Sequence, residues 1–445
     1  MKDKQAEERP AVVPEGAKQA GEIRDRWFWV EPSAWTERML TALENGVKGG
    51  KWFALSDKVY SERVLRAAFA DVKANRGVAG VDHVTVEMFE QDLQENVKKL
   101  SEALSKGEYR PAAVKRVWIP KPGSREKRPL GIPTVRDRVV QGSLRKVLEP
   151  IFEKGFSEES YGFRPGRGCK DALRRVVRLL RAGHEWVVDA DIKGYFETIP
   201  HDKLMERIKE KVADGRVLRL LEIFLKQGII EDMREWTPEE GTPQGAVISP
   251  LLSNIYLDAL DHTMEERGFK MVRYADDVVI LCKSQEEAEK ALEIVKRWME
   301  EAGLELHPEK TRIIGMNEAG GFDFLGYNFR RGRRWPRKKS LNKFKERIRA
   351  KTKRTNGNSL KTIISEINRT TKGWFEYFKH SDKTTYPSLD GWIRMRLRSI
   401  LRKRAGRKGR GRGEDHGRWP NAYFMKQGLF SLEVAYASLL NPQMR

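Results

Sequence analysis

The chain has 445 residues, enough for about three domains of ordinary size and for a large hydrophobic core. Its two cysteines, Cys169 and Cys282, cannot form a disulfide framework or a thiolate zinc module, so we expect a reducing compartment such as the bacterial cytoplasm. No uncharged apolar run approaches the ~20 residues of a membrane-spanning helix, and the first residues lack the apolar region of a signal peptide. We therefore expect no membrane partner.

The net charge of +22 is concentrated at one end of the chain. Residues 330–445 contain 32 Lys and Arg against 8 Asp and Glu, whereas residues 1–329 carry 54 basic and 56 acidic side chains. An excess of this size attracts polyanions and makes their binding depend on salt through counterion release. A surface that serves only solubility needs no such imbalance, so we expect a nucleic-acid partner.

Helices are expected first along the chain. Residues 1–22 are polar and hold too few apolar side chains to offset chain entropy, so we expect a disordered arm there. Between residues 27 and 104 apolar side chains recur at helical spacing, with a turn at 75–80. Residues 110–133 then predict an extended, basic β-hairpin with a Pro-Gly signal at its turn.

Three β segments are expected next, at 186–192, 271–282 and 322–329. The first ends in acidic residues, and the second consists of two short apolar runs split by a pair of aspartates. A helix is expected at 284–303. The mixture predicts an α+β fold whose antiparallel sheet presents carboxylates at strand ends.

Helical spacing returns beyond residue 337. In the segment 389–401 the apolar residues share one face, while Arg394, Arg398 and Arg402 recur every four residues on another. This spacing predicts a helix that packs on one side and displays cations on the other. The stretch 402–413 is basic and rich in glycine, and the segment after it is expected to dock on the helices.

The adjacent acids Asp276 and Asp277 are the first candidates for chemistry. Their mutual repulsion inside an apolar hairpin is costly unless a cation relieves it. Mg²⁺ prefers carboxylate oxygens, and two such ions can activate an attacking oxygen and stabilise a leaving pyrophosphate. Asp191, at the end of another strand, could supply a third ligand. An Asp-Asp pair alone is weak evidence, because most such pairs lie in loops.

Several further segments make the pattern specific. Tyr274-Ala275-Asp276-Asp277 resembles motif C of reverse transcriptases, and Asp191-Ile192-Lys193-Gly194-Tyr195-Phe196 resembles motif A. Motif B, the fingers hairpin and flanking motifs are similar at Gly241-Thr242-Pro243-Gln244-Gly245, Ile119-Pro120-Lys121-Pro122, Lys127-Arg128-Pro129-Leu130-Gly131, Tyr161-Gly162-Phe163-Arg164-Pro165 and Phe324-Leu325-Gly326-Tyr327. The order and spacing resemble group II intron-encoded reverse transcriptases, also called maturases, over residues 50–440.

This resemblance implies a right-hand polymerase, with fingers, a palm that contains an antiparallel sheet, and an α-helical thumb or maturase domain. The expected units are an N-terminal extension at 1–49, fingers at 50–185, a palm at 186–330, a thumb and maturase X domain at 331–403, and a basic tail that binds DNA or RNA at 404–445. The family's His-Asn-His endonuclease with paired cysteines is not recognisable, so the chain resembles bacterial members that lack it.

The resemblance also implies the catalytic residues and their cofactor. Asp191, Asp276 and Asp277 would be the catalytic carboxylates and, together with the backbone carbonyl of Ile192, the ligands of two Mg²⁺ ions. Asp189 is a rival for Asp191, because alternation puts both on one face of a strand. The Gly194 to Phe196 motif favours Asp191, which leaves Asp189 as a supporting or structural acid.

The nucleotide-binding residues implied by the resemblance are Lys121, Arg128, Tyr195, Phe196, Gln244 and Gly245. The two cations would neutralise the triphosphate of a dNTP, although either could contact template phosphates instead. Phe196 would exclude a 2′-hydroxyl, unless it is an ordinary core aromatic. Gln244 and Gly245 would let backbone approach a base pair, or simply form a tight turn before a helix near residue 249.

The expected nucleic-acid contacts are in the C-terminal quarter of the chain, at Lys343, Arg347, Arg394, Arg398, Arg402, Arg410 and Arg412. The implied function is RNA-directed DNA synthesis together with binding of the parent intron RNA to assist splicing and mobility. The partners would be group II intron RNA, a DNA target or primer, and dNTPs. Two alternatives remain: an RNA-folding cofactor with little polymerase role, and a reverse transcriptase of a retron or diversity-generating element.

Overall fold

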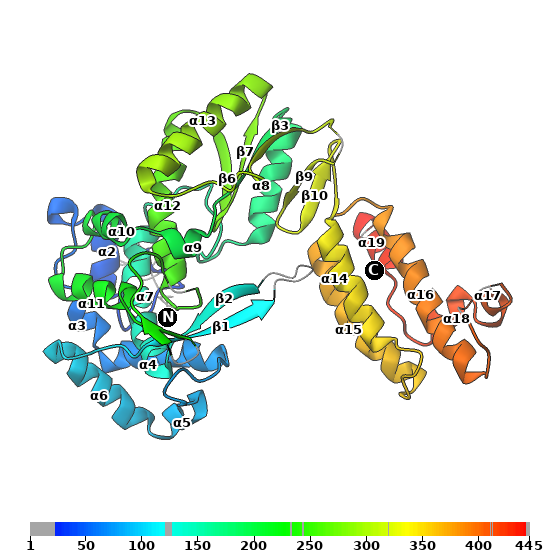
Figure 1. Cartoon of the computed structure of the whole chain (residues 1–445), viewed down its shortest axis with the longest axis horizontal. Helices are drawn as coiled ribbons and strands as arrows, with labels where there is room; N and C mark the ends of the chain where they lie inside the picture. Colours follow the sequence, from blue (N-terminus) through cyan, green and yellow to red (C-terminus); the bar gives the residue numbers. More distant parts are fainter. Residues whose placement is uncertain are drawn as a thin grey trace, which may run out of the picture.

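The computed structural model describes residues 23–120, 127–231, 234–242, 244–318, 320–409, 411 and 413–441. A helical layer and a small sheet form the fingers (Figure 1). Their elements are α2 (Glu37–Asn45), η1 (Lys48–Gly50), α3 (Ser56–Val59), α4 (Glu62–Ala74), α5 (Val86–Gln91), α6 (Leu93–Lys106), β1 (Val114–Pro120), β2 (Lys127–Ile132), α7 (Val135–Glu153), α11 (Gly215–Leu225), β4 (Ile229–Glu231) and β5 (Arg234–Trp236). The strand order of this sheet is β2-β1-β4-β5. The expected hairpin at 110–133 is therefore confirmed, and it extends toward α14 (Lys338–Lys351).

The palm is a four-stranded sheet in the order β6-β7-β3-β8 with helices on both faces. Its elements are α8 (Cys169–Arg181), β3 (Trp186–Asp191), α9 (Tyr195–Thr198), α10 (His201–Lys209), α12 (Ser249–Glu266), β6 (Lys270–Tyr274), β7 (Asp277–Cys282), α13 (Gln285–Ala302) and β8 (Arg312–Gly315). The three expected β segments are all observed, because the last contains β9 (Phe322–Phe324) and the start of β10 (Tyr327–Arg330).

Each face of the palm sheet belongs to a different core. Val188 and Ile280 pack with the helices of the fingers and with α12 and α13, whereas Val187 and Val279 pack with α8 and with β9 and β10. This explains why β3 and β7 are apolar on both faces until their acidic ends. The expected boundary between fingers and palm is at residue 186. Helix α8 lies before this boundary but packs on the palm, and strand β4 lies after it but joins the sheet of the fingers. The two units interleave along the chain.

The thumb is a bundle joined to the palm through the sheet β11-β10-β9 (Figure 1). Its elements are β11 (Arg333–Pro336), α14, α15 (Leu360–Phe378), α16 (Thr385–Arg404), α17 (Asp415–Arg418), α18 (Asn421–Lys426) and α19 (Leu432–Leu440). Phe424 and Leu432 share one core with Phe344, Ile367 and Ile393 of the three long helices. The segment after residue 413 is therefore docked on the bundle, as the sequence predicts.

Buried Asp390 of α16 fixes the start of the last helix. Its carboxylate accepts hydrogen bonds from the Ser431 hydroxyl at 2.6 Å and from the Leu432 backbone nitrogen at 3.0 Å. A carboxylate at this place satisfies amide donors that a helix N-terminus leaves unpaired. No helix in the described part of the chain is long and apolar enough to span a membrane.

Candidate active site

Strand pairing brings two of the predicted catalytic acids together. In the antiparallel pair β3–β7, Asp191 stands directly opposite Asp277, and Asp189 stands opposite Val279. Directly opposed residues point to the same face of a sheet, so Asp189, Asp191 and Asp277 share the face that looks toward α8 and β9. Tyr274 pairs with Asp277 across the β6–β7 turn, which leaves Ala275 and Asp276 as the turn residues. The three predicted acids therefore meet at one end of the palm sheet.

The acids repel one another in this structure. Burial, followed by the charge of Asp276, raises the pKa of Asp277 to about 6. Burial also raises the pKa of Asp276, with the charge of Asp191 adding to the effect. Asp277 is nevertheless accessible to solvent at the start of β7. The negative charges of Asp276 and Asp277 are therefore only partly balanced by their surroundings.

Three cations lie close to these acids. The Lys310 ammonium is 3.2 Å from Asp191 Oδ1, and the Arg312 Nε is 3.7 Å from Asp189 Oδ2. The charge of Arg337, at the start of α14, lowers the pKa of Asp277 against the raising effect of burial. Asp189 thus has its own arginine partner, and its pKa is still raised to about 6, chiefly by burial.

The chemistry of this donor set fits a divalent metal. It offers hard carboxylate oxygens whose repulsion a cation would relieve. Within the described residues, no three acidic, His or Cys side chains are already gathered as a metal-holding cluster, and Lys310 sits on Asp191 instead. Ile192 follows at an isolated bridge to Leu306, with its side chain buried. Asp191, Asp276 and Asp277 are the acids that could converge on a metal.

A cleft of ≈ 320 Å³ adjoins the motif A helix α9 and is lined by Phe196, Gln244, Gly131 and Arg116 among others. Phe196 is half-buried and stands edge-on to Tyr195, at 5.5 Å between ring centroids. Its position suits a wall of a nucleotide pocket.

Tyr195 does not line this cleft. The Tyr195 ring is buried, and its hydroxyl donates to the Ser253 carbonyl at 2.7 Å. The expectation that Tyr195 contacts a nucleotide is therefore not supported. The physical reason is that α9 turns this side chain toward α12, into the main core.

The motif B loop lies against the fingers hairpin. The Gly131 nitrogen donates to the Gln244 carbonyl at 2.6 Å, and the Thr242 nitrogen donates to the Phe196 carbonyl at 2.6 Å. Gly245 has a φ of +111°, and a Cβ there would run into the Gly131 carbonyl oxygen. The loop thus ties motif A to strand β2, which carries the exposed Arg128. Lys121 lies outside the described residues.

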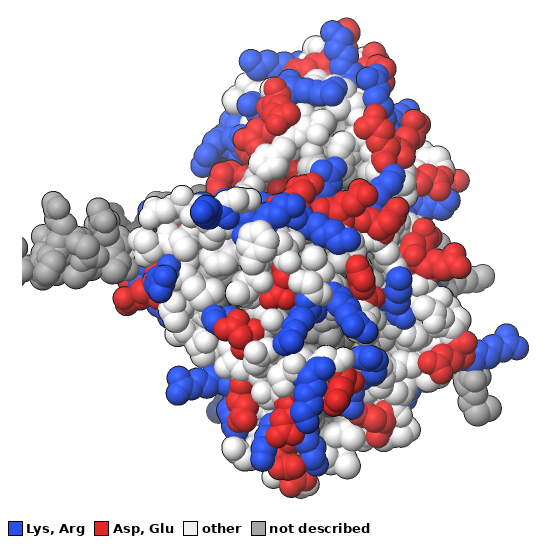
Figure 2. All heavy atoms as spheres, turned by 90° about the vertical axis from the view of Figure 1, so that its left-hand side faces the viewer, with Lys and Arg blue, Asp and Glu red and all other residues white. Residues whose placement is uncertain are grey.

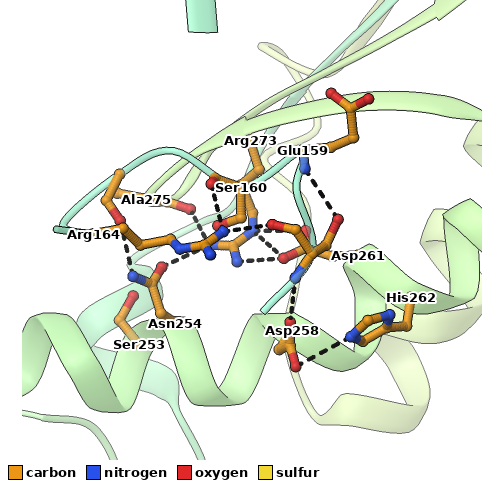
Figure 3. A network of polar contacts seen from close by, with 12 residues as sticks. Glu159, Ser160, Arg164, Ser253, Asn254, Asp258, Asp261, His262, Arg273 and Ala275 are labelled. Atoms are coloured by element: carbon orange, nitrogen blue, oxygen red, sulfur yellow. Dashed lines mark hydrogen bonds and ion pairs between the residues drawn. The ribbon is translucent and has the colours of Figure 1, made fainter. Parts of the chain in front are cut away.

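A buried polar network stands behind the motif C turn (Figure 3). Arg273 of β6 is fully buried, and its guanidinium is paired with Asp261 through two nitrogens. It also donates to Asn254 Oδ1 at 2.9 Å and to the Ala275 carbonyl at 3.0 Å. Sequence reasoning missed these residues. The signal was present as an arginine inside an otherwise apolar strand, since a buried charge requires a partner.

The predicted nucleic-acid contacts divide into two groups. Lys343 and Arg347 are exposed on α14, and among the described residues neither has an ion pair. Arg398 is 2% exposed and donates to the Trp419 carbonyl at 2.9 Å and to Asn421 Oδ1 at 2.7 Å. The prediction that Arg398 is displayed to RNA is therefore wrong, because the segment after residue 413 covers that face of α16.

The neighbours of Arg398 are also engaged. Arg402 is 2.7 Å from buried Asp415 and donates to the Lys408 carbonyl. Arg394 lies 4.0 Å from Asp390, with a side chain that is 15% exposed. Arg410 and Arg412 lie outside the described residues. On the side of the molecule away from the thumb, cations and anions are interspersed (Figure 2), in keeping with the balanced charge of residues 1–329.

Comparison with known proteins agrees with this geometry. Residues 119–329 match the family of reverse transcriptases, RNA-dependent DNA polymerases, and residues 341–419 match the maturase-specific domain of group II introns. The second match crosses residue 404, where the sequence suggested a boundary between thumb and tail. Reverse transcriptase domains depend on a divalent metal ion.

Individual relatives extend these matches. The chain is 34% identical to Protein YkfC of Escherichia coli (strain K12), over 57% of this chain and 76% of that protein. It is 41% identical to the group II intron-encoded protein LtrA of Lactococcus lactis subsp. cremoris, over 40% of this chain but only 30% of LtrA. A solved partial Cas6-RT-Cas1–Cas2 complex is 28% identical, covering 56% of this chain and 41% of that chain, with a TM-score of 0.37 that is too low to support an argument. The chain belongs to the group II intron-encoded reverse transcriptase and maturase family.

Proposed function

We propose that this protein is an RNA-directed DNA polymerase that also binds its parent group II intron RNA as a maturase. The observation that carries the polymerase half is the register that sets Asp191 opposite Asp277, with Asp276 at the adjoining turn. Carboxylates that are held together despite burial and mutual repulsion are typical of a site that binds a cation. The match to both domain families supports the same conclusion.

The residues of the palm have separate tasks in this reaction. Asp191 and Asp276 would hold Mg²⁺ ions directly, with Asp277 and the Ile192 carbonyl available to assist. Two ions bound there would help deprotonate the primer 3′-hydroxyl and stabilise the pyrophosphate that leaves. Lys310, paired with Asp191 Oδ1, would compete with a metal for that oxygen. In the product, the primer 3′ oxygen is bonded to the α-phosphate of the added nucleotide.

The residues around the cleft select the nucleotide. Phe196 forms the wall that a 2′-hydroxyl would strike, and the Gln244 and Gly245 backbone carries the new base pair. Arg128, exposed on β2, neutralises the triphosphate together with Lys121. The missing side chain of Gly245 lets this loop pack on Gly131 of strand β2, which holds the loop beside the cleft.

The maturase half rests on the thumb. The exposed face of α14 presents Lys343 and Arg347, and the maturase-specific match begins at residue 341. Contacts of this kind recognise RNA through phosphates and shape more than through base edges. The same match disfavours a retron or diversity-generating enzyme, which leaves the RNA-folding cofactor with little polymerase activity as the second candidate.

The deciding experiment compares Asp276→Ala with the matched surface variant Asp202→Ala, which removes an exposed carboxylate from α10. Extension of a DNA primer on an RNA template is measured in Mg²⁺, and splicing of the flanking intron RNA is measured in parallel. We expect Asp276→Ala to abolish extension while it retains RNA binding and splicing. Extension that survives in Asp276→Ala would make the site assignment wrong, and a wild-type protein that promotes splicing without extension would favour the cofactor alternative.

A further inference from the structure

Arg273 joins three segments at the back of the motif C turn through its guanidinium and its backbone (Figure 3). It is paired with Asp261 and donates to Asn254, both on α12, and it donates to the Ala275 carbonyl within the turn. Its own backbone nitrogen and oxygen bridge to the segment around Ser160, because the Arg273 nitrogen donates to Glu159 and the Tyr161 nitrogen donates to Arg273, each at 2.9 Å. The arginine is 0% exposed.

The turn that Arg273 contacts has an unfavourable backbone. Ala275 has a φ of +58°, a left-handed conformation that costs an alanine free energy because its Cβ crowds the backbone. Such a conformation persists where surrounding contacts fix it. Here one contact is the hydrogen bond from Arg273 to the Ala275 carbonyl.

A second contact is made with the same turn at the Ala275 nitrogen. Gly162 packs so tightly that a Cβ there would run into the Ala275 nitrogen. The Gly162 carbonyl accepts a hydrogen bond from Asn254 Nδ2 at 2.8 Å, and Asn254 Oδ1 accepts from Arg273. Arg273 therefore contacts the Ala275 carbonyl, Gly162 packs against the Ala275 nitrogen, and Asn254 links the two, one residue before Asp276.

Stability alone is a weak reason for this arrangement. A buried Arg–Asp pair can be exchanged for apolar side chains of similar volume with little loss of stability, and often with a gain. Apolar side chains cannot, however, donate a hydrogen bond to the Ala275 carbonyl. The feature that requires a guanidinium is its planar fork, which serves a carboxylate, an amide oxygen and a backbone carbonyl at the same time.

We propose that Arg273 is a positioning residue for catalysis: through the Ala275 carbonyl it fixes the left-handed turn and thereby sets where the Asp276 carboxylate stands relative to Asp191. This inference rests on the proposed polymerase function. Arg273 itself touches neither the metal nor the substrates. Loss of the Arg273 guanidinium should leave a folded protein in which the turn samples other conformations and the Asp276 carboxylate is displaced.

The test removes the Arg273 guanidinium together with its partner Asp261, so that no buried charge is left unpaired. The double variant Arg273→Met/Asp261→Leu is compared with wild type for single-nucleotide incorporation at saturating dNTP, for primer–template affinity and for thermal unfolding. We expect a folded protein with affinity within about twofold of wild type and an incorporation rate lowered by ~10–100-fold, the range seen when groups that orient metal ligands are removed. A folded double variant that incorporates nucleotides within twofold of the wild-type rate would overturn the proposal.

Two further variants separate positioning from a general loss of structure. Tyr256→Phe removes a buried hydrogen bond from the same helix, to the Ala302 carbonyl, and should leave the incorporation rate within about twofold. Adding Ala275→Gly to the double variant should restore part of the rate, because glycine adopts the left-handed turn without strain. An equal loss of rate in Tyr256→Phe, or no recovery with Ala275→Gly, would count against positioning.

Arg273→Lys covers the case in which the double variant does not fold. Lysine keeps the charge opposite Asp261 but cannot reach three partners at once, so a folded, slow enzyme is expected and an unimpaired one overturns the proposal. Hydrogen exchange of the 274–277 amides gives a readout that does not depend on polymerase activity. Faster exchange in both Arg273 variants but not in Tyr256→Phe supports the proposal, and unchanged exchange contradicts it. If the wild-type protein shows no extension activity while the variants show this exchange pattern, the polymerase function is overturned, but the role of Arg273 in holding the turn is not.

Discussion

The palm and the thumb use charge in opposite ways. In the palm, Asp191 and Asp277 face each other across a strand pair, and burial raises the pKa of Asp277 to about 6. In the thumb, Arg398 is buried, and it donates hydrogen bonds to the Trp419 carbonyl and to Asn421. One region holds carboxylates that repel one another, and the other uses a buried arginine to bind a neighbouring segment of the chain.

This difference indicates where ligands act. Groups that repel one another in the free protein gain most from an added counterion, so the palm is the place for a cation. Groups that already hold internal partners gain little from an added anion. We therefore propose that RNA phosphates contact the exposed Lys343 and Arg347 of α14, and not the arginines of α16 that hold the C-terminal segment.

The largest expected effect separates the two acids of strand β3. Asp191→Asn should lower primer extension by more than the ~10–100-fold typical of groups that only orient metal ligands, because Asp191 faces Asp277. Asp189→Asn should lower extension by less than tenfold, because Asp189 faces Val279 and already has Arg312 as a partner. Single-turnover extension on an RNA template measures both. Equal losses would mean that the two acids share the ligand role.

Arg398→Met tests the internal use of charge in the thumb. Two hydrogen bonds from a charged donor are lost, so the free energy of unfolding should fall by about 2–3 kcal/mol. Chemical denaturation measures this change. Affinity for intron RNA, measured well below the melting temperature, should stay within about twofold of wild type. Lower RNA affinity with unchanged stability would restore Arg398 as an RNA contact.

The pair Lys343→Gln/Arg347→Gln tests the exposed face of α14. If both cations contact phosphates, intron RNA affinity should fall and the slope of log affinity against log salt should flatten by about 1.4–1.8. Stability should be unchanged, because neither side chain is buried. The control Arg63→Gln/Lys98→Gln removes two exposed cations from the fingers. A control that flattens the slope equally would show that binding follows total charge only.

Asp277→Asn tests the repulsion among the acids through protein stability, and its effect has a defined sign. Because the pKa of Asp277 is raised to about 6 from an ordinary value of 3.8, ionisation opposes folding above that range and costs nothing below the lower value. In the absence of metal, Asp277→Asn should therefore stabilise the protein at pH 7 and do so less at pH 5. Thermal unfolding at both pH values measures the difference. A stabilisation by Asp277→Asn that is larger at pH 5 than at pH 7 would contradict repulsion among these carboxylates.

Much of the palm could be predicted because its signals are local. Alternation in the strands and a split between two short apolar runs placed the β6–β7 hairpin and its aspartates. The choice between Asp189 and Asp191 could not be made from alternation, since both lie on one face. The deciding fact is the partner across the strand pair, Asp277 or Val279, and pairing register depends on distant segments.

The thumb shows why the rest of the site could not be predicted. Spacing of four residues correctly put Arg394, Arg398 and Arg402 on one helical face, but spacing does not reveal what covers that face. The cover comes from α17 and α18, which bring Asp415 and Asn421 to these arginines. The buried pair of Arg273 with Asp261 was missed for a similar reason, since its partner lies on a helix earlier in the chain.

The most direct test of the central claim replaces Mg²⁺ with Fe²⁺ and uses locally generated hydroxyl radicals to cut the backbone near the bound metal. We predict two groups of cuts, close to Asp191 and close to Asp276, that excess Mg²⁺ suppresses and that Asp276→Ala weakens. Cuts confined to other parts of the chain, or cuts that Mg²⁺ does not suppress, would contradict a metal site formed by these acids.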